Sequence, residues 1–170
     1  MLRTAVLATA CAVALSGCVI IASDTAERTI IAPAVSPAVQ TSPEARYADA
    51  LSDSRRLLEE VARDPLRKPA DMLAMMKLQP GHVIADIRPE EGYFTRLFAP
   101  AVGAGGHVYA FVPNQTSGRE NAFADTLAST YSNTSRVTGA LETMTFDQPL
   151  DVVFMGEEYH DFTIPRFGVD

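Results

Sequence analysis

Apolar residues recur with two spacings along this chain, and each spacing predicts a different element. Apolar positions three or four residues apart, which share one face of a helix, occur over 42–63, 69–76 and 93–102, with a weaker pattern over 121–130. Short continuous apolar runs, typical of buried strands, occupy 83–87, 108–112 and 152–155, and a shorter strand is expected at 136–138. Strands alternating with helices predict an α/β fold with a parallel sheet.

The first expected helix begins with a strong cap. Ser42 supplies a hydroxyl group, Pro43 fits the first helical position, and Glu44 places an acid in the first turn. Its expected apolar face consists of Tyr47, Leu51, Leu57, Leu58 and Val61. The charged residues expected on its solvated face are Arg55, Arg56, Glu59 and Glu60. The helix is expected to end at residues 64–65, an aspartate followed by a proline.

The N-terminal residues have the features of an export signal. A single positive charge at Arg3 precedes the apolar run 5–15, which is too short to cross a bilayer as a permanent helix. Residues 15–18, Leu-Ser-Gly-Cys, resemble the lipobox of bacterial lipoproteins, which implies a signal peptide over 1–17 and a lipid on Cys18. A plain secretory signal that contains a cysteine is the alternative. The lipobox reading predicts a protein anchored by lipid in the bacterial cell envelope, on the periplasmic side.

Composition limits the number of domains, the kinds of partner and the disulfides that this chain can have. The chain has 170 residues, of which 47% are hydrophobic, so one packed domain is expected over 42–170, after a flexible tether over 18–41 that contains two prolines. The net charge of −7 argues against nucleic acid as a partner, because phosphates would be repelled. Both cysteines, Cys11 and Cys18, precede the expected domain, so no disulfide is expected within it.

The segment 78–112 carries the most specific motif. It reads strand, tight turn, helix and strand, which is typical of a nucleotide-binding βαβ unit. Asp86 lies at the end of the first strand and Gly92 at the end of the turn, as in class I S-adenosylmethionine (SAM) dependent methyltransferases, which this segment resembles. A D-x-x-P-G-G-G-Y-F-T turn of exported, predicted methyltransferases is similar to residues 86–95, through Pro89, Gly92, Tyr93, Phe94 and Thr95.

This resemblance implies a Rossmann-like sheet that binds SAM. Its cofactor-binding residues would be Asp86, Pro89, Gly92, Tyr93 and, in part, Asn114. Other positions depart from the pattern: Arg88, Glu90 and Glu91 replace glycines, and Val112 replaces the acid that accepts hydrogen bonds from the ribose. Loss of that acid is expected to weaken nucleoside binding by on the order of 2 to 4 kcal/mol. We therefore expect weak SAM binding and low methyltransferase activity.

The loop after the last predicted strand holds the candidate catalytic residues. The resemblance places residues 157–162, Glu-Glu-Tyr-His-Asp-Phe, where methyltransferases face the transferred methyl group. His160 is a candidate general base, with Tyr159 and Asp161 positioning it or the substrate. The alternative is a polar loop with a solvated histidine. The sequence has no serine-hydrolase elbow or phosphate-binding P-loop, and its three histidines lack metal-ligand spacing.

The resemblance covers about residues 63–170. A complete methyltransferase sheet has seven strands in the order 3-2-1-4-5-7-6, and only the first four are expected here, so a shortened member of the family with an incomplete sheet is implied. The run 152–155 would then be an exposed edge through which the chain could self-associate. SAM is a cytoplasmic cofactor, whereas the N-terminus directs export. Two functions stay open: a methyltransferase with an unknown acceptor, and a non-catalytic, membrane-anchored binding or scaffold lipoprotein.

Overall fold

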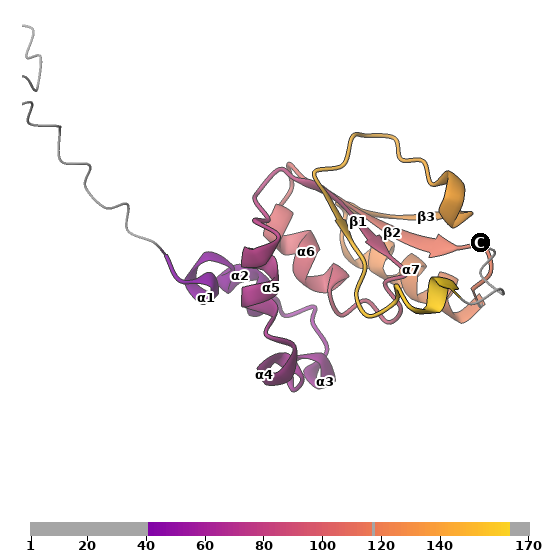
Figure 1. Cartoon of the computed structure of the whole chain (residues 1–170). Helices are drawn as coiled ribbons and strands as arrows, with labels where there is room; N and C mark the ends of the chain where they lie inside the picture. Colours follow the sequence, from indigo (N-terminus) through magenta and orange to yellow (C-terminus); the bar gives the residue numbers. More distant parts are fainter. Residues whose placement is uncertain (1–40, 117, 164–170) are drawn as a thin grey trace, which may run out of the picture. The chain divides into compact units, whose positions relative to one another are not determined.

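The computed structural model describes residues 41–116 and 118–163, whose centre is a four-stranded parallel sheet (Figure 1). Its strands are β1 (Val83–Ile87), β2 (His107–Pro113), β3 (Thr134–Gly139) and β4 (Val152–Phe154), in the order β3-β2-β1-β4. The expected α/β fold and the expected order of the first four strands are confirmed. β3 is longer than its sequence pattern indicated, and β4 is one residue shorter.

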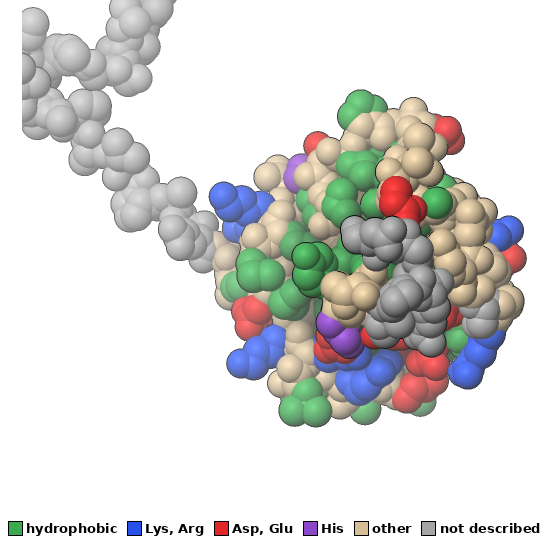
Figure 2. Space-filling model, turned by 45° about the vertical axis from the view of Figure 1, so that its right-hand side comes forward, with side chains coloured by type: hydrophobic (Ala, Val, Ile, Leu, Met, Phe, Trp, Pro, Cys, Tyr) green, Lys and Arg blue, Asp and Glu red, His purple; other side chains and the backbone are tan. Residues whose placement is uncertain are grey.

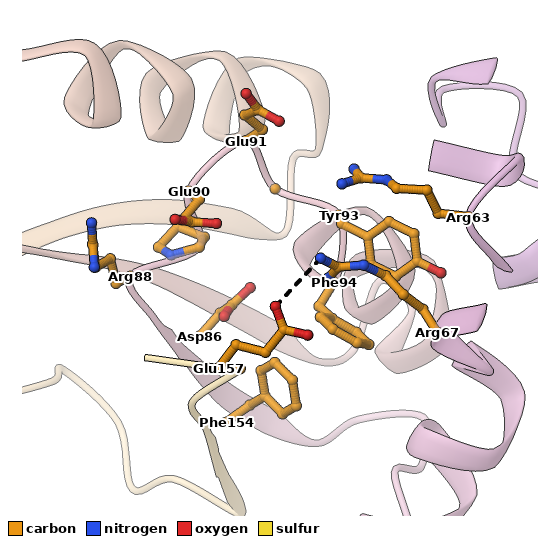
Figure 3. Close-up of a pocket in the computed structure, with 13 residues that line it drawn as sticks. Arg63, Arg67, Asp86, Arg88, Glu90, Glu91, Tyr93, Phe94, Phe154 and Glu157 are labelled. Carbon is orange, nitrogen blue, oxygen red and sulfur yellow. Dashed lines mark ion pairs between the residues drawn. The ribbon is translucent and has the colours of Figure 1, made fainter. Parts of the chain in front are cut away.

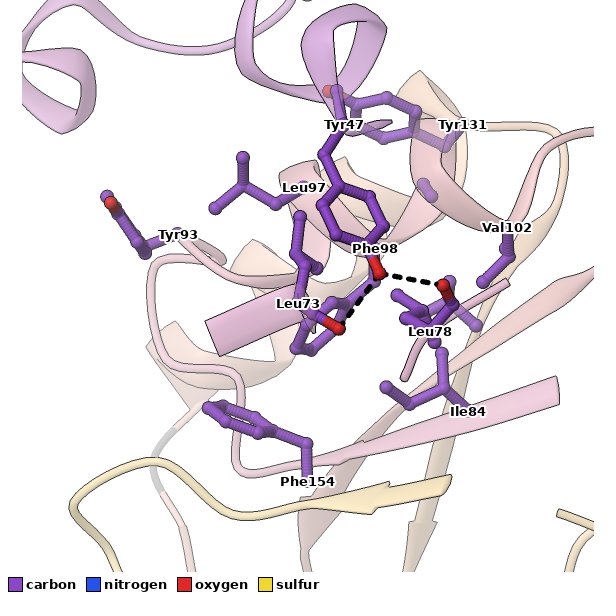
Figure 4. Close-up of a cluster of buried hydrophobic side chains, with 13 residues drawn as sticks. Tyr47, Leu73, Leu78, Ile84, Tyr93, Leu97, Phe98, Val102, Tyr131 and Phe154 are labelled. Atoms are coloured by element: carbon purple, nitrogen blue, oxygen red, sulfur yellow. Dashed lines mark hydrogen bonds between the residues drawn. The ribbon is translucent and has the colours of Figure 1, made fainter. Parts of the chain in front are cut away.

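Both helices that connect neighbouring strands pack on one face of the sheet. α6 (Thr95–Val102) joins β1 to β2 and α7 (Gly118–Thr130) joins β2 to β3, each as a crossover between parallel strands. Leu97 and Phe98 of α6 are fully buried with Ile84 and Val108 of the sheet (Figure 4). Pro100, expected to help end α6, lies inside it, and the helix continues to Gly103, whose φ of 65° ends it.

The other face of the sheet is covered mainly by the connection between β3 and β4, which contains a short 3-10 turn, η1 (Leu141–Thr143). Phe146 of this connection packs against Tyr109 and Phe111 of β2, with ring centroids 5.1 and 6.0 Å apart. A second turn, η2 (Asp161–Thr163), adds the buried side chain of Phe162. This face therefore depends on loop residues, and Val153 of β4 is 58% exposed.

The expectation of one continuous helix over 42–63 is wrong. The chain forms five short helices, α1 (Pro43–Arg46), α2 (Ala48–Leu51), α3 (Leu58–Val61), α4 (Asp64–Arg67) and α5 (Pro69–Met75). After α2, Asp53 accepts a hydrogen bond from the backbone N–H of Arg55 at 2.8 Å, and such local bonds compete with helical ones. Leu58 is consequently 87% exposed. Tyr47 keeps its expected role, buried with its hydroxyl group donating to the carbonyl oxygens of Leu73 and Leu78. Leu51 is half-buried and packs against the same core, whereas Leu57 and Val61 are exposed.

The helix break also changes the environment of the charged residues around it. Arg56 and Glu60, expected in solvent, are 6% and 1% exposed. Arg56 pairs with Asp64 at 2.6 Å, and Glu60 pairs with Arg96 of α6 at 2.8 Å. Residues 64–65, expected to end a helix, instead begin α4. The short helices are thus held against the sheet domain by buried ion pairs as well as by apolar contacts.

The N-terminal predictions lie outside the described residues. They concern the signal peptide over 1–17, Cys18 and the tether over 18–41, of which only the last residue is described. Within the part of the chain that the structure describes, none of the helices has the length and apolar character needed to span a bilayer.

Candidate functional site

A small pocket opens at the carboxyl ends of β1 and β4. It is lined by the turn that follows β1, by residues that follow β4, and by two arginines of the α4 region (Figure 3). Its lining residues are Arg63, Arg67, Asp86, Arg88, Pro89, Glu90, Glu91, Gly92, Tyr93, Phe94, Phe154, Gly156 and Glu157. The chain passes from β1 to β2 on one side and returns to β4 on the other, so the pocket lies at the switch point where α/β proteins bind ligands.

The pocket is small in this conformation. Its volume of about 40 Å³ corresponds to a few water molecules, since one water needs roughly 10 to 15 Å³. A single ammonium or carboxylate group fits such a space, whereas a nucleoside requires the walls to move.

The turn after β1 has a backbone conformation that normally belongs to glycine. Arg88 and Glu90 have φ angles of 57° and 52°, and Gly92 has a φ of 91°. A left-handed conformation costs a residue with a Cβ atom roughly 1 to 2 kcal/mol. A Cβ on Gly92 would also lie 2.5 Å from the side chain of Leu127, so that position requires glycine. The glycine-rich turn shape is therefore present although two of its residues are not glycines.

Asp86 is the buried acid of the pocket. Its side chain points into the pocket, the residue is 2% exposed, and it accepts a hydrogen bond of 2.6 Å from the hydroxyl group of Thr95 (Figure 3). Burial raises the pKa of Asp86 to about 7, and the bond from Thr95 opposes this only in part. A carboxyl group with this pKa is partly protonated at neutral pH, and a cationic ligand group nearby would favour its ionised form.

Two arginines and an aromatic ring form the opposite wall. The guanidinium groups of Arg63 and Arg67 lie 5.4 and 4.8 Å from the centre of the Tyr93 ring, and Arg67 lies 3.6 Å from Glu157. Burial and the neighbouring Asp64, which accepts a hydrogen bond of 2.7 Å from the Tyr93 hydroxyl group, raise the pKa of Tyr93. Tyr93 therefore stays protonated and acts as a donor and a platform, and the arginines supply positive charge.

Arg88 lies at the centre of an ion-pair cluster beside the pocket. Its guanidinium group contacts Glu120 of α7 at 3.3 Å, Asp161 at 2.9 Å, and Glu158. Its side chain is 11% exposed. Figure 2 shows that acidic and basic side chains lie next to one another along the lower part of this side of the molecule. The cluster thus links the β1 turn to α7 and to the segment after β4.

The structure brings some of the predicted site residues together. Asp86, Pro89, Gly92 and Tyr93 all line the pocket. Asn114 does not line it; this residue is exposed, and its backbone N–H donates to Gly139 at 2.9 Å. Val112 is fully buried and presents no polar side chain at the end of β2.

The three candidate catalytic residues lie after β4 and do not line the pocket. Tyr159 is 77% exposed, and the side chain of His160 is 79% exposed, with its Nε2 atom 3.4 Å from Oδ1 of Asp161. Asp161 is also bound to Arg88. As the structure stands, an acceptor molecule could reach His160 from solution without entering the pocket.

Sequence reasoning missed three charged residues at this site. Arg63 and Arg67 reach the pocket because the expected helix is interrupted between α2 and α3. The charge pattern alone did not indicate this interruption. The two arginines are four residues apart with a proline between them, and this spacing was the one sequence feature that could have suggested that they lie together. Glu157 belongs to the loop 157–162 that the resemblance placed at the site, but no role was predicted for it; it lines the pocket with a φ of 65°.

Neither a protein-family profile nor a curated protein sequence matches this chain. Among solved structures, it is similar to a SAM-dependent methyltransferase from Aquifex aeolicus, with a TM-score of 0.53 and 21% identity, over 62% of this chain and 57% of that one. A protein-L-isoaspartate O-methyltransferase matches with a TM-score of 0.45 and 21% identity, over 52% and 28% of the two chains. The chain therefore spans little more than half of the first of these proteins, and that similarity shows that its described residues share the α/β Rossmann-like fold of this methyltransferase.

Proposed function

We propose that this protein is a SAM-dependent methyltransferase-like protein of unknown acceptor, which binds SAM in the pocket between β1 and β4. The observation that carries the proposal is Asp86, a buried carboxyl group with one hydrogen-bond partner at the carboxyl end of β1. It lies before a turn whose left-handed backbone is kept at Arg88, Glu90 and Gly92. A fold shared with methyltransferases and a turn of this shape together favour SAM over other nucleotides.

The pocket residues fit the amino-acid end of SAM. Asp86 can accept hydrogen bonds from an ammonium group, and the Nε atom of Arg63 is buried without a hydrogen-bond partner among the described residues. Arg63 and Arg67 can therefore bind a carboxylate on the opposite wall. Phe94 and Phe154, with ring centroids 4.6 Å apart, contribute an apolar wall that limits water. SAM, when bound, supplies an electrophilic methyl group.

For the transfer step, we propose the roles that the resemblance implies. His160 would remove a proton from the acceptor, and Tyr159 and Asp161 would position the imidazole or the acceptor. The exposure of His160 supports access for a large or surface-bound acceptor. His160→Ala is expected to lower methyl transfer without changing SAM affinity.

We further propose that the protein acts in the bacterial cell envelope. The lipobox-like residues 15–18 support lipid attachment at Cys18 after removal of 1–17, with 18–41 as the tether. Such a lipid would anchor the chain to a membrane on the periplasmic side, in agreement with the resemblance of residues 86–95 to exported predicted methyltransferases. Metabolic labelling with a radioactive fatty acid tests this, because Cys18→Ser must abolish the label.

A second candidate function is a non-catalytic binding or scaffold lipoprotein. Val112, which offers the ribose no acceptor, and the Arg88 cluster beside the pocket favour this alternative. It predicts a folded chain that binds a partner and no SAM.

Calorimetric titration of S-adenosylhomocysteine into the full chain separates the two functions. At pH 8, where Asp86 is ionised, we expect micromolar binding that Asp86→Asn weakens by about tenfold, the effect of one charge-assisted contact. Asp71→Asn, an exposed aspartate on α5, is the matched control. No binding by a folded chain would reject the methyltransferase proposal in favour of the second function.

A further inference from the structure

We infer that Arg88 closes the nucleoside side of the pocket, so that a ligand carrying a nucleoside binds fully only after the ion pairs of Arg88 with Glu158 and Asp161 are broken. This inference rests on the proposed binding of SAM. In the closed conformation the pocket would accept the amino-acid end of SAM and exclude its nucleoside.

These ion pairs join the ends of two neighbouring strands. β1 and β4 are neighbouring parallel strands, and their carboxyl ends border the crevice where a ligand of this fold binds. Arg88 is the first residue after β1, whereas Glu158 and Asp161 follow β4. The bonds from Arg88 to these carboxylates therefore cross the crevice from one strand end to the other.

Arg88 is held in place from more than one side. Its Nε and Nη2 atoms also lie 3.3 Å from the carboxylate of Glu120, in the first turn of α7. Hydrogen bonds between charged groups are about twice as strong as neutral ones, so this side chain is firmly fixed. A nucleoside that extends from the small cavity toward α7 would have to displace it.

The ion-pair cluster depends on the positive charge of Arg88. One guanidinium group contacts three carboxylates, so the carboxylates repel one another once the guanidinium is removed. Burial raises the pKa of Glu158, Arg88 opposes this, and the nearby Glu90 adds to the increase. Loss of Arg88 is therefore expected to separate the segment after β4 from α7 and to open the crevice.

Arg88→Gly is the most direct test, because glycine adopts the φ of 57° at this position without strain. In calorimetric titrations of the full chain, we expect Arg88→Gly to bind S-adenosylhomocysteine about tenfold more tightly than the unmodified chain, equivalent to about 1.4 kcal/mol. Glu90→Gly is the matched variant, since it relaxes the same turn but leaves the ion pairs of Arg88 in place. The increase in affinity for S-adenosylhomocysteine must be larger for Arg88→Gly than for Glu90→Gly.

A second variant changes the acidic partners of Arg88 and leaves Arg88 itself unchanged. Glu158→Gln combined with Asp161→Asn weakens the same bonds and leaves the turn unchanged, so it is also expected to raise the affinity. Circular dichroism checks that each variant is folded.

The outcomes are distinct. Tighter binding of S-adenosylhomocysteine by Arg88→Gly and by the double variant Glu158→Gln, Asp161→Asn supports the inference. Equal affinity of the unmodified chain and both variants, within about twofold, overturns it and leaves SAM binding intact. If no folded form binds S-adenosylhomocysteine, the proposed function fails, and this inference fails with it.

Discussion

Glu60 and Arg96 form a buried ion pair of 2.8 Å that joins α3 to α6. The two residues are 1% and 7% exposed. Arg96 also donates a hydrogen bond of 2.6 Å to the backbone carbonyl of Glu91, inside the turn that lines the pocket. The short N-terminal helices are thus connected to the candidate site through one arginine side chain.

Removal of Glu60 is expected to be strongly destabilising. Glu60→Ala leaves Arg96 buried without its carboxylate, and loss of one partner of a buried pair typically lowers the free energy of unfolding by about 3 to 5 kcal/mol. Urea denaturation followed by circular dichroism measures this change. The neighbouring Glu59→Ala is the control, because Glu59 is exposed, and its effect should stay within about 0.5 kcal/mol. Similar values for the two variants would show that the ion pair contributes nothing.

Asp86 is expected to make stability depend on pH. Its pKa is raised by burial from 3.8 to about 7, so between these values the folded chain keeps a proton that the unfolded chain has lost. The free energy of unfolding should therefore fall as the pH rises from about 4 to about 7, and Asp86 should add no further change above that range. Asp86→Asn, which can still accept the bond from Thr95, removes this contribution.

The measurement is the difference in unfolding free energy between the unmodified chain and Asp86→Asn at several pH values. Taking the difference removes the effect of other groups, such as Glu158, whose pKa is also raised by burial. Asp71→Asn should show no such pH-dependent difference. A constant difference between pH 5 and pH 8 for Asp86→Asn would mean that Asp86 is ionised throughout.

Glu90→Gly is expected to stabilise the chain. The backbone of Glu90 is left-handed, with a φ of 52°, and glycine removes a conformational cost of about 1 kcal/mol. The next residue provides the control, because Glu91 is not left-handed and Glu91→Gly should lower stability by about 0.5 to 1 kcal/mol through greater freedom of the unfolded chain. In urea denaturation, the free energy of unfolding is expected to rise for Glu90→Gly and to fall for Glu91→Gly. A loss of stability in both variants would contradict the left-handed turn.

Self-association through β4 is a further prediction. Within the described residues β4 is bonded on one side only, to β1, and its Val153 is 58% exposed. We expect the full chain to associate through this edge and Val153→Lys to reduce the association, because a charge disfavours edge-to-edge pairing. Light scattering over a range of concentrations measures the effect. A monodisperse monomer at all concentrations would exclude it.

The two central strands of the sheet, β1 and β2, were predictable because they are buried apolar runs. Residues 83–87 and 108–112 are apolar almost without interruption, since helices or loops cover them on both faces. The acid and the last glycine of the β1 turn, Asp86 and Gly92, were recognised through the resemblance to the methyltransferase turn. The structure adds a physical reason for the glycine, because a Cβ atom there would lie 2.5 Å from the side chain of Leu127.

The helix break was harder to predict because its cause is local and polar. Apolar spacing over 42–63 fits a helix, but a side-chain bond from Asp53 to the backbone of Arg55 ends the helical run. The burial of Arg56 and Glu60 then depends on partners distant in sequence, such as Arg96. Charge patterns along one segment contain no information about such partners, so the arginine wall of the pocket was not predicted.

The pairing of β1 with β4 sets an order for folding. Ile84 lies beside Val152, and Asp151 bonds through its backbone and its carboxylate to the backbone of Val83. Contacts between residues so far apart in sequence form slowly, because a long loop must close first. The edge of β1 that later receives β4 consequently stays unpaired while the first three strands assemble. During synthesis this edge is therefore expected to be the part of the sheet that a chaperone would have to cover.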